Sequence, residues 1–170
     1  MPRPRRTERF SLAMSGASLA ACRQQQMAVR AALGNKLTRA VFIREASLGL
    51  ARSGKIVRVW ELATERGVGQ DVVVADVLRG AFGGGSPPTP EPISKATFMI
   101  STTPDEHQLL ADETDRLRDT LEIRDRRAPM MRAASVGLAT SGAAVKVWEA
   151  AKERKVDASE VIAEALRSEL

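Results

Sequence analysis

Aromatic side chains are scarce in this chain of 170 residues. They make up 4% of the sequence, and tyrosine is absent. This composition argues against the rows of stacking aromatics that bind single-stranded nucleic acid without sequence preference. Apolar runs of about 18 residues or more are also lacking, so we expect no membrane span. Met1–Arg6 is basic but has no apolar stretch behind it, so we do not expect a secretory signal peptide.

Cysteine and histidine occur once each, as Cys22 and His107. A single cysteine cannot form a disulfide within the chain, which favours a cytoplasmic protein. The sequence has neither a Cys/His cluster for zinc nor a glycine-rich loop before a helix, so we expect no metal, no cofactor and no enzymatic activity. We expect Cys22 to be a buried packing residue and His107 to lie on a solvated helix face.

The positive charge of the chain is concentrated in its first half. The formal net charge is +5 and the isoelectric point is about 10.0. Residues 1–82 carry 14 Lys and Arg against 6 Asp and Glu, whereas residues 95–170 carry 12 against 14. Such an uneven excess is typical of proteins that bind polyanions. The alternative is a basic soluble protein without a polyanionic partner.

The chain contains an internal repeat with an offset of 88 residues. Arg44–Arg79 aligns with Arg132–Arg167 without a gap, and 20 of the 36 aligned residues are identical. Two copies of one unit indicate a homodimer fused into a single polypeptide. We therefore expect a monomeric pseudo-dimer whose two copies are free to diverge.

A segment rich in glycine and proline separates the two copies. It holds Gly83–Gly85 and four of the eight prolines of the chain. About ten residues of this kind can span on the order of 30 Å, enough to bring the second copy antiparallel to the first. The expected organisation is a basic arm at 1–6, a first repeat at 7–82, a linker at 83–94 and a second repeat at 95–170.

Each repeat is expected to fold as one strand followed by four helices. Apolar and polar residues alternate at Phe10–Ser15 and at Phe98–Thr102, which predicts a half-buried strand in each copy. Helices are expected around 17–33, 38–52 and 70–82, with copies around 104–121, 126–140 and 157–170. One more helix in each copy is expected to hold Val57, Val59, Trp60 and Leu62, or Val145, Val147 and Trp148. Thr103 with Glu106, and Asp157 with Glu160, each predict a capping box at a helix start.

A lone short strand needs a partner, and the other strand expected in this chain belongs to the other copy. We therefore predict that the two strands pair as an antiparallel ribbon backed by helices from both copies. This arrangement, together with Thr38–Ala46 at the start of a helix, resembles the ribbon-helix-helix family of DNA-binding proteins. The second copy of that segment, Arg126–Ala134, keeps only Arg132 and Ala134 of the family-like Ile-Arg-Glu-Ala run.

The resemblance implies a fold class and an organisation. The chain is expected to be mainly α, with one short two-stranded antiparallel ribbon. It would be a single-chain pseudo-dimer of two ribbon-helix-helix repeats, each with an extra helical pair. Tandem units of this kind are similar to the relaxosome accessory proteins of conjugative plasmids.

The resemblance also implies that the ribbon lies in the major groove and that its outward side chains contact base edges. The outward positions are Thr7, Arg9, Ser11, Ala13, Lys95, Thr97, Met99 and Ser101. Arg9 can make a bidentate contact to guanine, whereas Ala13 and Met99 offer apolar contact only. Part of the specificity is therefore expected to be indirect. The alternative is an ordinary solvated strand face.

Phosphate binding is implied at the start of the second helix of each copy, where backbone N–H groups are free. The residues there are Lys36, Thr38 and Arg39 in the first copy and Arg124, Arg126 and Arg127 in the second. Cations at a helix N-terminus oppose the helix dipole, and a bound anion removes that conflict. Arg3, Arg5 and Arg6 form a basic arm that we expect to be disordered and to reach DNA phosphates, with a solubilising tail as the alternative.

The function we expect is that of a sequence-specific protein that binds double-stranded DNA as an accessory factor at a plasmid or T-DNA transfer origin. A relaxase or another transfer protein is a possible further partner. A transcriptional repressor or a plasmid partition protein is the alternative, because fold analogy does not separate these roles. A second alternative is a helical protein–protein adaptor that docks partners through Trp60 and Trp148, for which core packing is the other interpretation.

Divergence between the copies favours a non-palindromic DNA site bound in one orientation. In that orientation the acidic first helix of the second copy, with the loop after it, is expected to face away from the DNA. Its acidic residues are Asp112, Glu113, Asp115, Asp119, Glu122 and Asp125.

Overall fold

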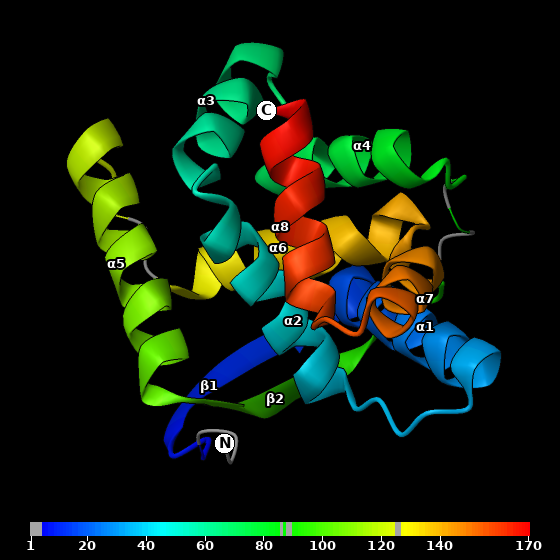
Figure 1. The fold of residues 1–170 in the computed structure, drawn as a ribbon. Coiled ribbons are helices and arrows are strands. Elements are labelled where there is room, and N and C mark those ends of the chain that lie inside the picture. The colour runs from blue at the N-terminus through cyan, green and yellow to red at the C-terminus, as the bar shows by residue number, and fades with distance from the viewer. Residues whose placement is uncertain (1–4, 86, 88–89, 125–126) are drawn as a thin grey trace.

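The computed structural model describes residues 5–85, 87, 90–124 and 127–170. These residues form two strands and eight helices in the order β1 (Glu8–Ser15), α1 (Gly16–Leu33), α2 (Arg39–Ser53), α3 (Ile56–Arg66), α4 (Gln70–Phe82), β2 (Ile93–Thr102), α5 (Pro104–Leu121), α6 (Arg127–Ser141), α7 (Ala144–Arg154) and α8 (Ala158–Glu169). The molecule is mainly helical, with one two-stranded sheet along one edge (Figure 1). The order of one strand followed by four helices occurs twice, as the sequence predicted.

The two strands form an antiparallel ribbon within the chain. The register runs from Glu8 opposite Thr102 to Met14 opposite Ala96, so the predicted pairing is confirmed. β2 is longer than predicted and begins at Ile93, inside the segment assigned to the linker. Residues 93–96 lack the alternation of apolar and polar side chains that predicts a strand. They join β2 because they pair with the end of the first strand and with Gly16.

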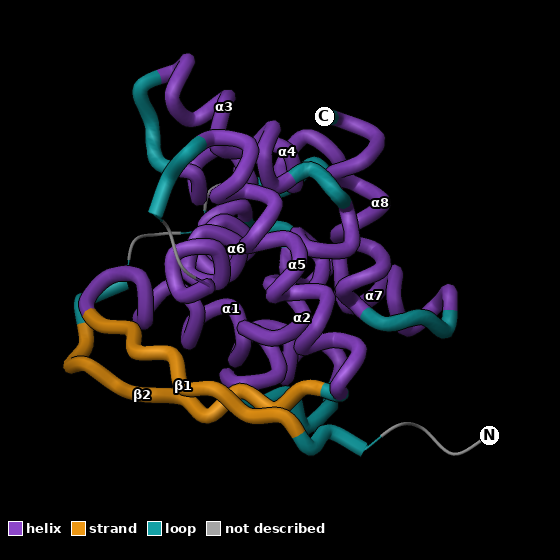
Figure 2. Tube along the Cα trace, turned by 90° about the vertical axis from the view of Figure 1, so that its left-hand side faces the viewer, coloured by secondary structure: helices purple, strands orange, loops and turns teal. Residues whose placement is uncertain are grey.

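The helices cover only one face of the ribbon (Figure 2). Leu12, Met14 and Ile100 point to that side and are buried. α1 and α2 both pack on β2 there. Successive side chains of a strand alternate between faces, so the residues between these three point away from the helices. The half-buried strands expected from the sequence are therefore confirmed.

Side chains cap the starts of α2 and α5. Thr38 Oγ1 accepts a hydrogen bond from the Val41 N–H over 3.1 Å. At α5 the predicted capping box is present, because Thr103 Oγ1 accepts from the Glu106 N–H over 3.1 Å and Glu106 Oε1 accepts from the Thr103 N–H over 2.8 Å. These bonds satisfy backbone donors that a helix start leaves without partners.

The second predicted capping box, at α8, is wrong. The side chain of Asp157 makes no capping hydrogen bond there. Instead the carboxylate of Glu45, which belongs to α2, accepts a hydrogen bond from the backbone N–H of Ser159. A residue more than a hundred positions away thus takes the place of the local cap.

Helices of the first half (residues 7–82) pack on helices of the second half (residues 95–170). α2 packs on α8, and α4 packs on α6. Glycines allow both approaches: a Cβ at Gly49 would lie 2.5 Å from Ile162 Cγ2, and a Cβ at Gly137 would lie 2.6 Å from Val74 Cβ. The offset of 88 residues relates Gly49 to Gly137 and Val74 to Ile162. The glycine therefore comes from the first half in one contact and from the second half in the other.

Two hydrogen bonds donated by arginines are related in the same way by the offset of 88 residues. Arg79 in α4 donates to the carbonyl oxygen of Thr140 over 3.0 Å. Arg167 in α8 donates to the carbonyl oxygen of Arg52 over 3.1 Å. Each arginine therefore satisfies a carbonyl near the end of the helix on which it packs.

The cysteine and the two tryptophans belong to the interior packing. Cys22 is buried, as predicted, and burial raises the pKa of its thiol to about 12. Trp60 is buried, and Trp148 is half-buried with its ring stacked on Phe42 at a centroid distance of 5.5 Å. Packing, the default interpretation of both tryptophans, agrees with these positions.

His107 does not lie on a solvated helix face, as the sequence had suggested. It is half-buried, and its ring centre lies 6.4 Å from that of Phe10. The strand covers this side of α5, because Phe10 points from the inner face of the ribbon toward the helices. Helical periodicity alone does not reveal a strand that packs from far away in the sequence.

Candidate nucleic-acid interface

The open face of the ribbon carries three cross-strand pairs of side chains. Along the ribbon they are Arg9 with Ser101, Ser11 with Met99, and Ala13 with Thr97. Strand alternation places all six away from the helices, and Met99, with 59% of its surface exposed, is the most prominent apolar member. The structure thus gathers six of the eight residues predicted to contact bases on one surface.

The other two residues predicted to contact bases, Thr7 and Lys95, are exposed near opposite ends of the ribbon. Lys95 lines a small cavity together with Ala13 and Arg132. Arg132 is exposed, and its Nη1 donates to the Ala13 carbonyl oxygen over 3.4 Å. Arg132 is not among the residues predicted to contact DNA, although its place in the family-like run was a signal. It adds a second cation at the Lys95 end.

The first residue of α2 and the first residue of α6 each lie over an aromatic ring of the ribbon. The guanidinium carbon of Arg39 is 5.8 Å from the centre of the Phe98 ring, and that of Arg127 is 5.0 Å from the centre of the Phe10 ring. Each pair joins the two halves of the chain. The rings attract the guanidinium groups and hold them beside the ribbon.

The remaining residues predicted to bind phosphate differ in their environment. Lys36, Thr38, Arg124 and Arg5 are exposed. The Thr38 hydroxyl oxygen accepts the capping hydrogen bond of α2, so this side chain holds the start of the helix in place. Arg3 and Arg126 lie outside the described residues.

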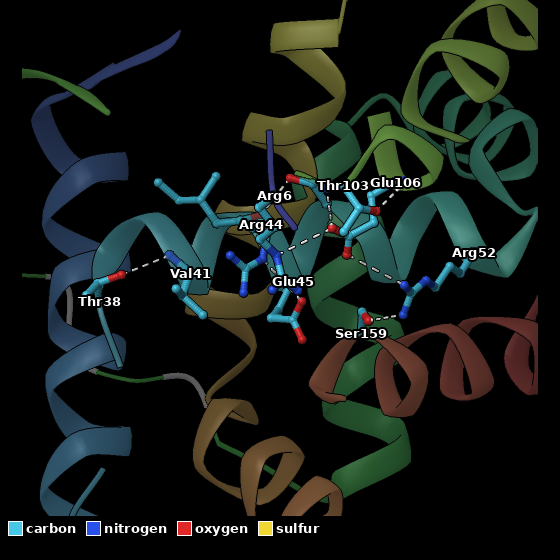
Figure 3. A network of polar contacts seen from close by, with 11 residues as sticks. Arg6, Thr38, Val41, Arg44, Glu45, Arg52, Thr103, Glu106 and Ser159 are labelled. Carbon is cyan, nitrogen blue, oxygen red and sulfur yellow. Dashed lines mark hydrogen bonds and ion pairs between the residues drawn. The ribbon is translucent and has the colours of Figure 1, made fainter. Parts of the chain in front are cut away.

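Arg6 belongs to a polar network rather than to a free arm (Figure 3). Its Nε lies 3.5 Å from Glu106 Oε1, while Arg52 Nη2 lies 3.8 Å from Glu106 Oε2. Arg52 Nη1 also donates to Ser159 Oγ over 2.6 Å. The network joins the segment before β1 to α2, α5 and α8. The expectation of a disordered arm therefore does not hold at Arg6, whose charge is paired within the protein.

Arg44 and Glu45 form a neighbouring, more enclosed pair on α2. Arg44 Nε lies 3.8 Å from Glu45 Oε2. Burial raises the pKa of Glu45, although Arg44 and the Ser159 hydrogen bond oppose this shift. Burial and the nearby charge of Arg6 lower the pKa of Arg44. Both groups thus belong to the interior contacts of α2 and not to the open face of the ribbon.

The helices that follow the two strands differ strongly in charge. α1 has the basic residues Arg23 and Arg30 and no acidic residue. α5 carries the exposed acids Asp112, Asp115 and Asp119, and it lies at the opposite side of the molecule from α1 (Figure 1). The electrostatic potential around the protein is therefore more positive on the side of α1 and more negative on the side of α5.

Comparisons with known proteins give no relative. The chain matches no family model, no curated protein and no solved structure. Within the described ranges, His, Cys, Asp and Glu form no group of three or more that could hold a metal ion. The helices described are all too short or too polar to cross a membrane.

Proposed function

We propose that this chain is a sequence-specific binding protein for double-stranded DNA that inserts its ribbon into the major groove. The observation that carries the proposal is the open ribbon face with its polar side chains, together with Arg39 and Arg127 at two helix starts, which lie over the rings of Phe98 and Phe10 in the same ribbon. A two-stranded ribbon fits the width of the major groove, and helix N-termini suit phosphates. Arg9 and its neighbours would contact bases while the two helix starts hold the backbone.

The proposal includes a single-chain pseudo-dimer of two ribbon-helix-helix repeats, each extended by a helical pair. Support comes from contacts that exchange the halves at an offset of 88 residues. The glycine contacts Gly49–Ile162 and Gly137–Val74 are one such pair, and the arginine–aromatic contacts are another. A twofold arrangement of this kind would place the Ser11–Met99 pair at the centre of the ribbon, since these two positions are opposite each other and differ by 88.

The two halves of the ribbon present different chemistry. Arg9 corresponds to Thr97, Ser11 to Met99 and Ala13 to Ser101 at the repeat offset. Because the two halves of the ribbon face differ, the DNA site does not need two identical half-sites. We therefore propose a non-palindromic DNA site bound in one orientation. The acidic α5 would then face away from the phosphates, where a basic surface of another protein such as a relaxase can reach it.

By resemblance to tandem ribbon-helix-helix proteins, the proposed role is that of an accessory factor at a plasmid or T-DNA transfer origin. An adaptor that docks partners through its tryptophans receives less support. Trp60 is buried at 4% exposure, and Trp148 is stacked on Phe42. Trp60 therefore offers no open surface, and the Trp148 ring already uses one face for packing inside the protein.

The test is selection of a duplex from a random pool, followed by fluorescence anisotropy between 50 and 200 mM salt. Replacing both Arg39 and Arg127 by Gln should weaken binding to all duplexes and reduce the slope of log K against log salt by about 1.8, or about 0.9 for each lost phosphate contact. Arg9→Ala should mainly reduce preference for the selected site over others, by about 1–3 kcal/mol.

The matched control is the double variant Arg58→Gln and Arg66→Gln. It removes the same two charges from α3, which lies on the side of the molecule opposite the ribbon (Figure 1). Its salt slope should stay close to that of the wild type. No binding to any selected duplex at 50 mM salt, or equal losses in the control and the test variant, would contradict the proposal.

A further inference from the structure

An acidic groove lies beside the end of the ribbon where β1 begins. Its volume is about 610 Å³, and it is bounded by α2, α5 and the start of α8. Four carboxylates line it: Asp105, Glu106, Asp157 and Glu160. The cations that α2 and the turn before α8 supply to its wall are Arg52 and Lys155, so the body of the protein leaves an excess of negative charge.

One further charge in the groove comes from the segment before β1. Arg6 lines the groove, and its Nε lies 3.5 Å from Glu106 Oε1. The Arg6 side chain keeps 34% of its surface exposed. Arg5, the residue before it, is exposed. The segment before β1 therefore already places one arginine against the carboxylates.

The other half of the chain has a corresponding groove of about 440 Å³. The offset of 88 residues relates Asp105, Glu106 and Glu160 to Ala17, Ser18 and Val72, and these three uncharged residues line the second groove. Pro87 and Pro90, which precede β2, also line it. Each groove is therefore built mainly from the helices of one half, and it receives residues from the segment before the strand of the other half. At these three related positions, carboxylates occur only in the groove whose segment is rich in arginine.

The second groove also has two carboxylates of its own, from Asp71 and Asp76 in α4. Asp76 is paired with Arg79, which lines the same groove, at an Oδ1–Nη1 distance of 3.2 Å. The charge supplied by the walls of the second groove is therefore smaller than that of the acidic groove.

We propose that the acidic groove is an intramolecular binding site for the arginines of the amino-terminal segment, which it withholds from anions outside the protein. Arg6 is the residue held in the structure, and the proposal extends to Arg5, the exposed residue before it. The docking of the segment does not depend on the proposed function. The effect of the docking on DNA binding does rest on it: if the chain binds DNA, groove carboxylates and DNA phosphates compete for the same guanidinium groups.

The ion pair between Arg6 and Glu106 is weak enough for DNA phosphates to compete with it reversibly. The Nε–Oε1 distance of 3.5 Å is long for a charged hydrogen bond, and Arg6 keeps 34% of its side chain exposed although Glu106 keeps only 9%. Such a loose, half-open pair stabilises the protein only weakly, so DNA phosphates can displace the carboxylates. The segment is covalently attached, and its effective concentration at the groove is therefore high. Weak non-specific attraction to a polyanion would be reduced, whereas a tight specific complex would still form.

Limited trypsin digestion of the full chain, followed by mass spectrometry, measures whether the segment is held. Trypsin cleaves after Arg5 and Arg6 once these residues leave the groove. In the double variant Glu106→Gln and Glu160→Gln, cleavage there should be about three- to fivefold faster, as expected when one weak ion pair and a further nearby negative charge are lost. The amide oxygen introduced by Glu106→Gln can still accept the hydrogen bond from the Thr103 N–H, so the start of α5 keeps its cap.

The matched control is Asp115→Asn with Asp119→Asn, which removes two exposed carboxylates of α5 that do not line the groove. Cleavage after Arg5 and Arg6 should remain at the wild-type rate in this control. An unchanged rate in the groove variant, or an equal rise in the control, would overturn the proposal.

Cleavage after Arg23 and Arg30 in α1 reports on unfolding in the same digest. If these sites also open in the groove variant, Arg6→Gln decides instead, because it leaves the groove walls intact. Cleavage after Arg5 should then rise by a similar factor, and an unchanged rate would overturn the proposal.

DNA binding supplies a separate measurement. Release of the segment in the groove variant should tighten binding to unselected duplexes at 50 mM salt by more than the same charge change does in the control. If the trypsin result holds but no duplex binds, the docking stands and the proposed function fails. If duplexes bind but cleavage in the groove variant is unchanged, the proposed function stands and the docking proposal fails.

Discussion

The guanidinium carbon of Arg127 lies 5.0 Å from the centre of the Phe10 ring, across the boundary between the two halves of the chain. Arg127 is the first residue of α6, where the helix dipole disfavours a cation. The face of the ring compensates with an attraction of its own. An aromatic side chain thus keeps a positive charge at a helix start beside the ribbon.

A double-mutant cycle can measure this attraction. We expect Arg127→Gln and Phe10→Leu to show a coupling energy of about 0.5–1 kcal/mol in urea unfolding. The same cycle with Arg39→Gln and Phe98→Leu should give a smaller value, because that pair is 5.8 Å apart. A coupling near zero for the first pair, or a larger one for the second, would show that packing alone holds these arginines.

The close approach of the halves predicts an unusual cost for adding a methyl group. Gly49→Ala and Gly137→Ala each place a Cβ within about 2.6 Å of a side chain of the facing helix, so each should lower the free energy of unfolding by about 1–3 kcal/mol. The control is Gly80→Ala in α4, where a Cβ meets nothing within 4 Å. That change should be neutral or stabilising by up to about 1 kcal/mol, since alanine favours helix. Losses as large in the control would contradict the packing argument.

The buried carboxyl of Glu45 predicts a pH dependence of stability. Burial raises its pKa above the ordinary value of 4.5, so between the two values the native state binds more protons than the unfolded state. The stabilisation contributed by protonated Glu45 is therefore fully present below pH 4.5 and is lost as the pH rises through the folded pKa. Glu45→Gln cannot titrate, so its stability relative to the wild type should rise over this interval.

Urea unfolding of the two proteins between pH 4 and 7 gives the difference directly and cancels the titration of the other carboxyls. Glu61→Gln, an exposed change on α3, is the control, and its difference from the wild type should stay level. A difference for Glu45→Gln that falls with rising pH would show that Arg44 outweighs burial at this site.

Several features of the fold could be predicted because they depend on neighbours in the sequence. Alternation at Phe10–Ser15 and Phe98–Thr102 indicates strands, since only one face of a strand can be buried here. The order Thr103, Pro104 and Glu106 is sufficient for a helix start, because its hydrogen bonds close within four residues. The repeat then indicated which two strands pair, and the observed antiparallel pairing agrees.

The candidate site could be predicted only in part. The alternation that predicts the strands also predicts which side chains point outward. Sequence patterns did not reveal the contact of Arg127 with Phe10, the commitment of Arg6 to Glu106 or the position of Arg132 beside Ala13. These contacts join residues that only the packing of helices from opposite halves brings together.

The sequence by itself determined the strands, most helix limits and the polar face of the ribbon, because backbone preferences and burial patterns act within a few residues. The tertiary structure decided which charges remain available. Asp157 carries a local capping signal, yet Glu45 from another helix accepts the hydrogen bond from the Ser159 N–H instead. Arg6 has the composition of a free basic arm, yet it pairs with Glu106. Electrostatic partners are chosen by distance in space, and that distance is set only when the helices pack.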